Sequence, residues 1–302
     1  MNTPYVWQDG HICPWKNGVT HVMNPSLNYG VAAFEGIRFY NTERGPAVFR
    51  LQDHLDRLFY SMDVLNMEAG HTHSQLAHAI KELITLNKMT EGYIRPIAWF
   101  SDEMIGLHNI AESTASIQVA LFDWKKSNPS SLSAHISPIR RIHPDTTDVR
   151  AKISGHYVNT HLALKHASEG GFDDAIMLDH EEFVAEASGA NIFCVQKGHL
   201  FTPQRGAILP GITRNTVITL ARSMGISVTA CKIPPVSLLD SDEIFICGTA
   251  YEIIPVSRVN TTAIGACTPG PITALLQTAY HSAVHGLLPE CKNWLTYVNV
   301  QV

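Results

Sequence analysis

The alternation of apolar and polar positions predicts short strands and two amphipathic helices in the first third of the chain. An Asp9-Gly10 pair between short apolar runs indicates a hairpin, because its second residue tolerates positive φ. Apolar residues recur at helical spacing after Asp53 and again after Ser74, so we expect these two residues to cap the helices. Strands are expected at about 93–100 and 117–122. This pattern indicates an α+β unit over residues 1–124.

The polar stretch 125–131 interrupts the pattern and predicts a linker between two domains. The region after it, residues 132–302, again mixes strands and helices, and a loop rich in Pro, Asp and Thr at 143–148 leads to Lys152. Expected strands are 132–140, 175–178, 183–186, 191–195, 200–202 and 243–247, and expected helices are one ending at Gly170-Gly171, 213–224 and 272–285. The chain is therefore predicted to be a two-domain α+β protein, with a small first domain and a large second one.

Composition and charge narrow the class of protein. With 302 residues, 45% apolar and 16% charged, the chain can bury a substantial core. A net charge of −5 and the absence of any long Lys/Arg cluster argue against a nucleic-acid partner. No apolar run approaches the roughly 20 residues that span a bilayer, and the first residues lack signal-peptide features. We therefore expect no membrane partner and a cytoplasmic location.

The common sequence signatures of metal sites and nucleophiles are missing. Six cysteines form no CxxC pair, which favours reduced core thiols, and sixteen histidines form no HExxH pattern, so no metal is expected. The sequence also has no GxSxG, no GxxxxGK[ST] and no GxGxxG after a strand. The sequence therefore gives no support to a serine hydrolase, a P-loop protein or a Rossmann-type dinucleotide-binding protein.

The remaining polar features suit an anionic, electrophilic cofactor. In the run 209–214, Gly211 and Thr213 stand where a helix begins, and free N–H groups there favour a phosphate, although Thr213 also reads as a plain helix cap. Lys152 lies at a loop-to-helix junction among small and apolar residues and offers an amine for imine chemistry. Glu186 ends an apolar strand, and a buried carboxylate needs a cationic partner such as a pyridinium nitrogen. Arg57 taken alone reads as an exposed helix arginine.

The order and spacing of several motifs carry a resemblance to a known family. In the second half these are Ala151-Lys152 to Tyr157, Glu186 to Phe193, Gly211-Ile212-Thr213-Arg214 and Gly248 to Ile253. In the first half they are Tyr29-Gly30, Phe34-Glu35-Gly36-Ile37-Arg38, His54 to Leu58 and Tyr93-Ile94-Arg95-Pro96. Over about residues 5 to 300 the chain resembles the fold-type IV pyridoxal-phosphate-dependent aminotransferases, and the first-half motifs are similar to the branched-chain amino acid members.

The resemblance implies a role for each matching residue. Lys152 would form the Schiff base with pyridoxal 5'-phosphate and carry the proton that moves between the substrate and the cofactor. Glu186 would keep the pyridine nitrogen protonated, and Tyr157 would donate to the phenolic oxygen. The phosphate would be bound by Arg57, Ile212, Thr213 and Thr249. The substrate would be bound by Phe34, Tyr93, Arg95, Thr249 and Ala250, with Arg95 as the cation for the second carboxylate of glutamate.

The implied reaction is transamination between leucine, isoleucine or valine and 2-oxoglutarate, so the partners are amino acids and 2-oxo acids. The resemblance also implies a homodimer or a higher homo-oligomer, with the active site between the two domains and completed by a loop of the partner subunit. Three alternatives stay open: a D-amino-acid or amine transaminase, a 4-amino-4-deoxychorismate lyase, and a non-catalytic binding protein that keeps the fold.

Two residues depart from the branched-chain pattern. Ala190 stands where these members usually carry a glutamate, and Tyr251 stands where a small residue is usual. Because Tyr251 follows the turn assigned to the substrate carboxylate, we expect its bulk to narrow or re-aim the side-chain pocket.

Overall fold

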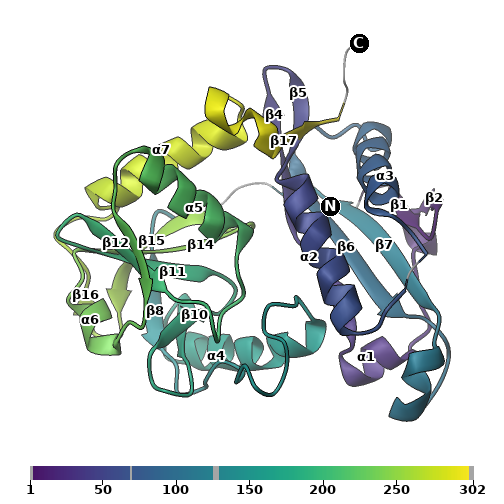
Figure 1. Cartoon of the computed structure of the whole chain (residues 1–302), viewed down its shortest axis with the longest axis horizontal. Helices are drawn as coiled ribbons and strands as arrows, with labels where there is room; N and C mark the ends of the chain where they lie inside the picture. Colours follow the sequence, from purple (N-terminus) through teal and green to yellow (C-terminus); the bar gives the residue numbers. More distant parts are fainter. Residues whose placement is uncertain (1–2, 69, 125–128, 299–302) are drawn as a thin grey trace. The chain divides into compact units, whose positions relative to one another are not determined.

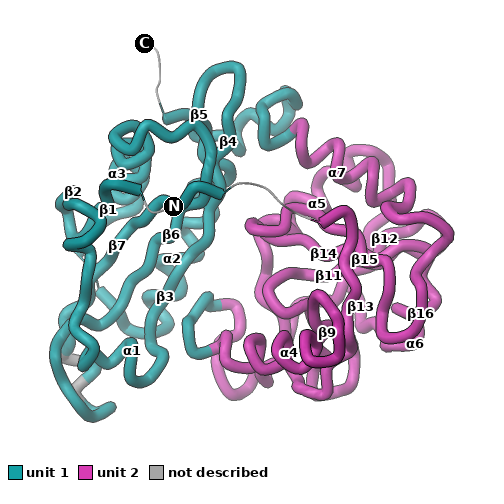
Figure 2. Tube along the Cα trace, turned by 180° about the vertical axis from the view of Figure 1, so that it is seen from behind, with its two compact units in different colours: residues 1–126, 151–155, 283–302 teal, residues 127–150, 156–282 magenta. Residues whose placement is uncertain are grey.

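The computed structural model describes residues 3–68, 70–124 and 129–298. The chain divides into two compact units, shown in different colours in Figure 2. Unit 1 contains residues 1–126, 151–155 and 283–302, and unit 2 contains residues 127–150 and 156–282. Residues 125–128 of the expected linker lie outside the described residues.

Two segments from the later part of the chain belong to unit 1. The strand β17 (Leu295–Tyr297) pairs antiparallel with β5 (Gly45–Phe49), and Ile153 forms an isolated antiparallel bridge with Ala33. Both contacts are long-range backbone pairings, for which the local pattern carries no signal. The sequence predicted two domains that are continuous in the chain, residues 1–124 and 132–302. The two compact units are discontinuous in the chain, and the domain bounds stay a prediction.

Unit 1 is built on one eight-stranded sheet whose neighbouring strands are all antiparallel (Figure 1). The strand order is β17-β5-β4-β6-β7-β1-β2, and β3 pairs with β6. Besides β5 and β17, the strands are β1 (Tyr5–Gln8), β2 (His11–Pro14), β3 (Ala32–Phe34), β4 (Ile37–Thr42), β6 (Gly92–Phe100) and β7 (Ala115–Phe122). The helical elements are η1 (Trp15–Asn17), α1 (Pro25–Tyr29), α2 (Leu51–Val64), α3 (His73–Leu86), η2 (Leu107–Glu112) and η4 (Pro289–Trp294). The predicted hairpin at Asp9-Gly10 is confirmed.

Helices α2 and α3 form as the apolar spacing predicts, but both predicted caps are wrong. Arg50 is the cap of α2, and Asp53 lies in the first turn, where its carboxylate accepts a 2.7 Å hydrogen bond from Arg50 Nε. Thr72 caps α3 in a reciprocal capping box with Gln75. The sequence contains this pattern, but the predicted cap, Ser74, lies two residues after the observed one. Both helices contribute fully buried leucines and isoleucines to the core over the sheet, among them Leu55, Leu58, Leu76 and Ile80.

Unit 2 is built on a nine-stranded mixed sheet in the order β10-β9-β8-β15-β14-β11-β12-β13, with β16 beside β15. Its strands are β8 (Leu132–Ile136), β9 (Asp174–Leu178), β10 (Val184–Ala187), β11 (Asn191–Gln196), β12 (His199–Pro203), β13 (Val228–Cys231), β14 (Glu243–Gly248), β15 (Glu252–Val259) and β16 (Thr262–Ala263). Its helices are α4 (Tyr157–Glu169), α5 (Ile212–Ser223), α6 (Pro235–Leu239) and α7 (Pro271–Val284), and η3 (Ser154–His156) precedes α4. The predicted strand 132–140 ends early, at Ile136, because Pro138 has no N–H to donate to a ladder.

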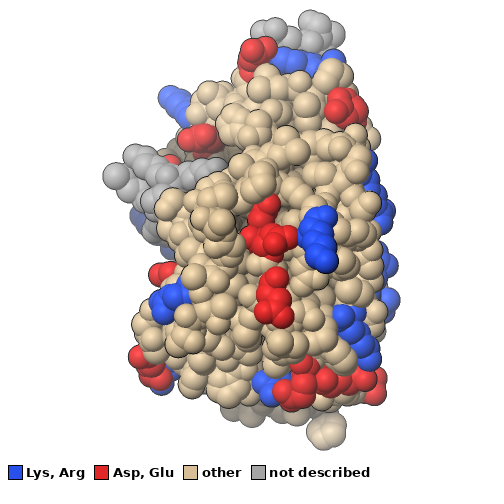
Figure 3. Space-filling view, turned by 90° about the vertical axis from the view of Figure 1, so that its left-hand side faces the viewer, with Lys and Arg blue, Asp and Glu red and all other residues tan. Residues whose placement is uncertain are grey.

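The face drawn in Figure 3 carries charges of both signs. On the face drawn in Figure 3, acidic and basic side chains are interspersed among uncharged ones, so neither sign dominates that face. None of the helices formed by the described residues is long and apolar enough to cross a membrane.

Candidate active site

The backbone around Lys152 is fixed inside unit 1. Its carbonyl accepts a 3.1 Å hydrogen bond from the N–H of Phe34, and its own N–H donates to Ser61 Oγ at 2.8 Å. Three residues further, the Gly155 N–H donates to the Gly30 carbonyl at 2.9 Å. A Cβ on Gly155 would lie 3.2 Å from that carbonyl oxygen, so glycine allows this close approach without displacing Gly30. The segment 151–155 is therefore laid tightly against β3 and the end of α1.

The side chain of Lys152 faces an aromatic ring. Its Nζ lies 4.8 Å from the ring centroid of Phe34, and Arg95 Cζ lies 4.9 Å from the same centroid. Arg95 Nη2 donates to the Tyr93 hydroxyl at 3.0 Å, and the Tyr93 ring stacks on Trp124 at 5.0 Å. Unit 1 thus gathers four predicted site residues into one cluster of aromatic and cationic groups. Trp124 was missed by the sequence interpretation, because a half-exposed tryptophan next to a predicted linker carries no signal.

Gly36 makes room for this cluster. A Cβ built on Gly36 would lie 1.8 Å from the Tyr93 hydroxyl oxygen, a distance that no side chain can occupy. The glycine in the Phe34-Glu35-Gly36 motif is therefore explained by the position of Tyr93. The Nε of the neighbouring Arg95 is buried and makes no hydrogen bond to any residue that the structure describes. The guanidinium lies over the rings of Phe34 and Tyr93, with Cζ at 4.9 and 5.4 Å from their centroids.

Arg57 is not an exposed helix arginine, so that interpretation was wrong. Its side chain is 12% exposed and binds Glu35 in a fork, with Nε at 2.6 Å from Oε1 and Nη2 at 3.0 Å from Oε2. Glu35 is fully buried, and His54 Nδ1 lies 2.7 Å from its Oε2. Burial alone would raise the pKa of Glu35, but Arg57 and His54 outweigh it and hold that pKa well below its ordinary value. Burial lowers the pKa of His54 more than the Glu35 carboxylate raises it.

In unit 2, Glu186 is buried in a pocket of hydrogen-bond donors. Its Oε1 accepts from Arg141 Nε at 2.5 Å, and its Oε2 accepts from the Leu209 N–H at 3.1 Å and from Asn191 Nδ2 at 3.2 Å. Arg141 is therefore a cationic partner of Glu186, of the kind that a buried carboxylate needs. The sequence interpretation missed it because the two residues lie 45 positions apart. A positive neighbour at this distance favours the ionised carboxylate.

Asn191 connects Glu186 to the start of α5. Its Nδ2 also donates to the Leu209 carbonyl at 3.0 Å, two residues before the N-cap Gly211. No side chain of the described residues caps α5, and its first two residues, Ile212 and Thr213, are buried. The first-turn N–H groups of this helix are the kind of donors that bind phosphates.

The other predicted residues of unit 2 lie at the ends of elements. Tyr157 opens α4, and Thr249 and Ala250 form the turn between β14 and β15; all three are partly exposed. Ala190 and Tyr251, which depart from the branched-chain pattern, both lie next to Gly248. A Cβ built on Gly248 would lie 3.6 Å from the Ala190 Cβ and 3.6 Å from the Tyr251 ring. Burial and the nearby Asp174 raise the pKa of Tyr251 to about 12, so its hydroxyl is protonated at neutral pH.

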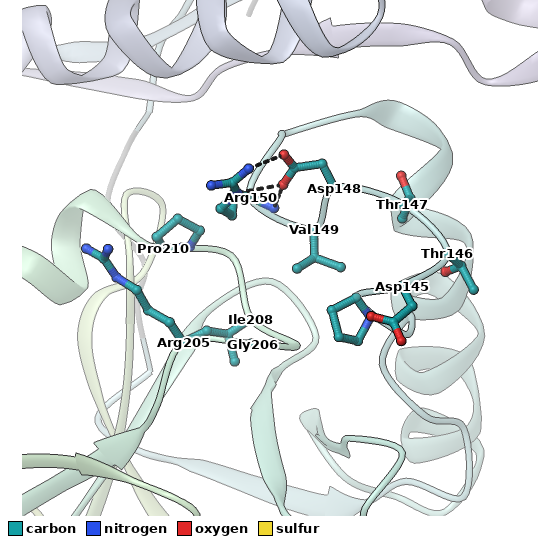
Figure 4. A pocket seen from close by; sticks show the side chains of 11 residues that line it. Asp145, Thr146, Thr147, Asp148, Val149, Arg150, Arg205, Gly206, Ile208 and Pro210 are labelled. Carbon is teal, nitrogen blue, oxygen red and sulfur yellow. Dashed lines mark hydrogen bonds and ion pairs between the residues drawn. The ribbon is translucent and has the colours of Figure 1, made fainter.

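Unit 2 also holds a cavity of about 600 Å³ (Figure 4). It is bounded by the loop Pro144 to Arg150, which leads to Lys152, and by residues 205–210, which lead to α5. In Figure 4 the Arg150 guanidinium is paired with the Asp148 carboxylate, at 2.6 Å between Nη2 and Oδ2. None of the predicted site residues is among those that line the cavity.

Comparisons with known proteins match almost the whole chain. Residues 32–259 match the family model of the class IV amino-transferases. The branched-chain-amino-acid aminotransferase of Pseudomonas aeruginosa is 37% identical over 298 residues, which are 97% of this chain and 97% of that protein. The T.th. branched-chain amino acid aminotransferase complexed with N-(5'-phosphopyridoxyl)-L-glutamate superposes with a TM-score of 0.95 at 37% identity, over 98% of this chain and 99% of the other. The same relative complexed with 4-methylvaleric acid gives a TM-score of 0.95 at 37% identity, again over 98% and 99%.

The two mixed units and the groups they carry define a fold-type IV enzyme. The chain belongs to the class IV aminotransferases and, within that family, to the branched-chain amino acid aminotransferases.

Proposed function

We propose that the protein uses pyridoxal 5'-phosphate to transfer the amino group between branched-chain L-amino acids (leucine, isoleucine and valine) and 2-oxoglutarate. The observation that carries the proposal is the connection through Asn191 in unit 2, which fixes the buried carboxylate of Glu186 next to the turn before α5. A carboxylate for a protonated ring nitrogen and N–H groups for a phosphate are what this cofactor needs from a protein. The residues present therefore fit pyridoxal phosphate.

When bound, the cofactor supplies an electron sink for the pair released at the substrate Cα. Lys152 is proposed to hold it covalently and to carry the proton to and from the substrate. Glu186, paired with Arg141, is proposed to bind the pyridine nitrogen, and Tyr157 to donate to the phenolic oxygen. Arg57, Ile212, Thr213 and Thr249 are proposed to bind the phosphate.

The aromatic and cationic cluster in unit 1 supports the substrate assignment. The rings of Phe34, Tyr93 and Trp124 offer apolar surface for an aliphatic side chain, and Arg95 offers a guanidinium for the second carboxylate of glutamate. Thr249 and Ala250 are proposed to bind the substrate's α-carboxylate. A branched-chain relative that was crystallised both with a phosphopyridoxyl glutamate and with 4-methylvaleric acid supports two side-chain types in one enzyme.

A transamination screen with 2-oxoglutarate tests this function. We expect turnover with leucine, isoleucine and valine, and little with their D-enantiomers or with simple amines. Preference for D-amino acids or amines would favour the alternative transaminase, and pyruvate release from 4-amino-4-deoxychorismate without transamination would favour the lyase.

We also propose a homodimer, supported by an exposed apolar patch on unit 1. Its side chains come from α1 and the segments around it: Val19, Val22, Leu27, Ile105 and Leu107 are each between 61% and 72% exposed. The Gly106 N–H donates to the Tyr29 hydroxyl at 3.1 Å and the Met104 N–H donates to the Met23 carbonyl at 3.2 Å, which brings the segments together. An apolar patch of this kind is typical of an interface. Light scattering after size-exclusion chromatography should give twice the chain mass, and Leu27→Lys with Ile105→Lys should give monomers.

A cytoplasmic location is proposed as well. All six cysteines are free thiols, as suits a reducing compartment. Cell fractionation with an antibody against the chain tests it.

A further inference from the structure

Ser61 connects the residue proposed to hold the cofactor with the residue proposed to bind its phosphate. The Ser61 hydroxyl accepts the hydrogen bond from the Lys152 N–H at 2.8 Å and donates its own to the Arg57 carbonyl at 2.7 Å. Ser61 is 0% exposed, so water does not compete for either bond. Its oxygen is the acceptor on which the Lys152 N–H depends.

These bonds complete a closed ring within unit 1. From Lys152 the ring runs through Ser61 to the Arg57 backbone, and from the Arg57 guanidinium to the buried Glu35 carboxylate. Glu35 follows Phe34 in the chain, and the Phe34 N–H returns to the Lys152 carbonyl at 3.1 Å. The Glu35 N–H itself donates to the Pro96 carbonyl at 2.9 Å, which ties the ring to the sheet at β6.

We propose that Ser61 is a positioning residue that sets the place of Lys152 relative to Arg57, and so matches the covalent anchor of the cofactor to its phosphate anchor. The inference rests on the proposed function, because it concerns the same cofactor. Ser61 acts only through its hydrogen bonds to the backbone of Lys152 and of Arg57. Removing the Ser61 oxygen takes this acceptor away from the Lys152 N–H. The lysine can then move from the position in which its amine and Arg57 can bind the same molecule of pyridoxal phosphate.

The test compares Ser61→Ala with Ser61→Thr, which keeps a hydroxyl, and with Thr85→Ala as a matched control. Thr85 makes the same bond to the carbonyl four residues earlier in α3, to Lys81 at 3.0 Å, but is exposed and does not belong to the ring of bonds around Lys152. Three quantities are measured: the dissociation constant for pyridoxal phosphate, the pH midpoint of the bound cofactor's visible absorbance, and the hydrogen-exchange rate of the Lys152 amide.

We expect Ser61→Ala to weaken cofactor binding about ten-fold, to shift the absorbance midpoint and to speed exchange at the Lys152 amide. Ser61→Thr should recover most of the binding and the midpoint, and Thr85→Ala should leave all three unchanged. A merely structural serine would lower thermal stability without moving the absorbance midpoint, and that result would overturn the proposal. Should Ser61→Ala fail to fold, slow exchange of the Lys152 amide in the wild-type holoenzyme supports the proposal, and fast exchange overturns it. Wild-type protein that takes up no pyridoxal phosphate would instead contradict the proposed function.

Discussion

Arg141 and Glu186 form a buried ion pair, with 2.5 Å between Nε and Oε1 and with 7% and 8% of the two side chains exposed. The adjacent Arg140 also binds a glutamate, Glu182, at 2.5 Å, but those side chains are 37% and 64% exposed. Neighbouring arginines thus each pair with a glutamate, one pair buried and the other exposed to solvent. The comparison separates the contribution of a buried pair from that of a solvated one.

The two pairs give a matched prediction. In the cofactor-free protein, Arg141→Met should destabilise the fold by about 3–5 kcal/mol, because it leaves the Glu186 carboxylate buried without its cation. Arg140→Met should cost less than about 1 kcal/mol, because its pair is screened by water. Urea unfolding of both variants measures the difference, and equal losses would contradict the account of the buried pair.

A second prediction concerns pH. The pKa of Glu35 lies below its ordinary 4.5, so the stability it contributes is present above that pH and is lost as the pH falls below it. The pKa of His54 is lowered from 6.5, so the unfolded chain takes up this proton first and stability already falls as the pH drops below 6.5. We expect Tm to decrease between pH 7 and pH 5 and to decrease further towards pH 3.

The control for this prediction is a pair of histidine variants. His54→Asn, which keeps a donor but cannot titrate, should flatten the change in Tm between pH 7 and pH 5. His78→Asn should leave the change as in the wild type, because the His78 side chain is 78% exposed. If His54→Asn gives the wild-type pH profile, buried His54 is not the group responsible.

Replacement of Gly36 tests how closely the substrate cluster is packed. Gly36→Ala would place a methyl group 1.8 Å from the Tyr93 hydroxyl oxygen, so Tyr93 or the backbone at residue 36 must shift, which disturbs the contacts of Tyr93 with Arg95 and Trp124. We expect a loss of about 1–3 kcal/mol in stability and a higher KM for amino acid substrates. Addition of Tyr93→Phe, which removes the clashing oxygen, should recover part of the stability. Wild-type Tm and KM in Gly36→Ala would show that this packing is unimportant.

Arg95 is predicted to discriminate between the two half-reactions. Its Nη2 donates to the Tyr93 hydroxyl at 3.0 Å and its Cζ lies 4.9 Å from the Phe34 ring centroid, so the guanidinium belongs to the cluster proposed to bind the substrate. Arg95→Ala should lower kcat/KM for glutamate and 2-oxoglutarate by one to two decades, for a contact worth about 1.5–3 kcal/mol. The half-reactions with leucine, isoleucine or valine should fall much less. Single-turnover kinetics measure both, and equal losses would refute a glutamate-specific role.

The sequence predicted the elements far better than their long-range contacts. Apolar spacing located α2 and α3 within two or three residues, and turn chemistry located the hairpin at Asp9-Gly10, because both signals are local. Motif spacing correctly identified the family and the two-domain α+β fold of its members. The assignment of residues 151–155 and 283–302 to unit 1 depends on pairing with β3 and β5, which no local window records.

In the candidate site too, the sequence predicted individual residues better than their long-range partners. The predicted residues Phe34, Tyr93, Arg95 and Lys152 do gather in unit 1. Their supports, Ser61 and Trp124, have no motif of their own, and the helix pattern around Arg57 alone contains no reason for its burial. In each case the missing information was a partner far away in the chain: Glu35 for Arg57, and Arg141 for Glu186.

The most direct measurement of the central claim is to find the lysine that carries the cofactor. The holoenzyme is reduced with borohydride, digested and analysed by mass spectrometry, with Lys152→Ala treated in parallel. We predict a phosphopyridoxyl group on the peptide containing Lys152, no label and no transamination in the variant, and a folded variant by circular dichroism. A label on any other lysine of the wild-type protein would contradict the account.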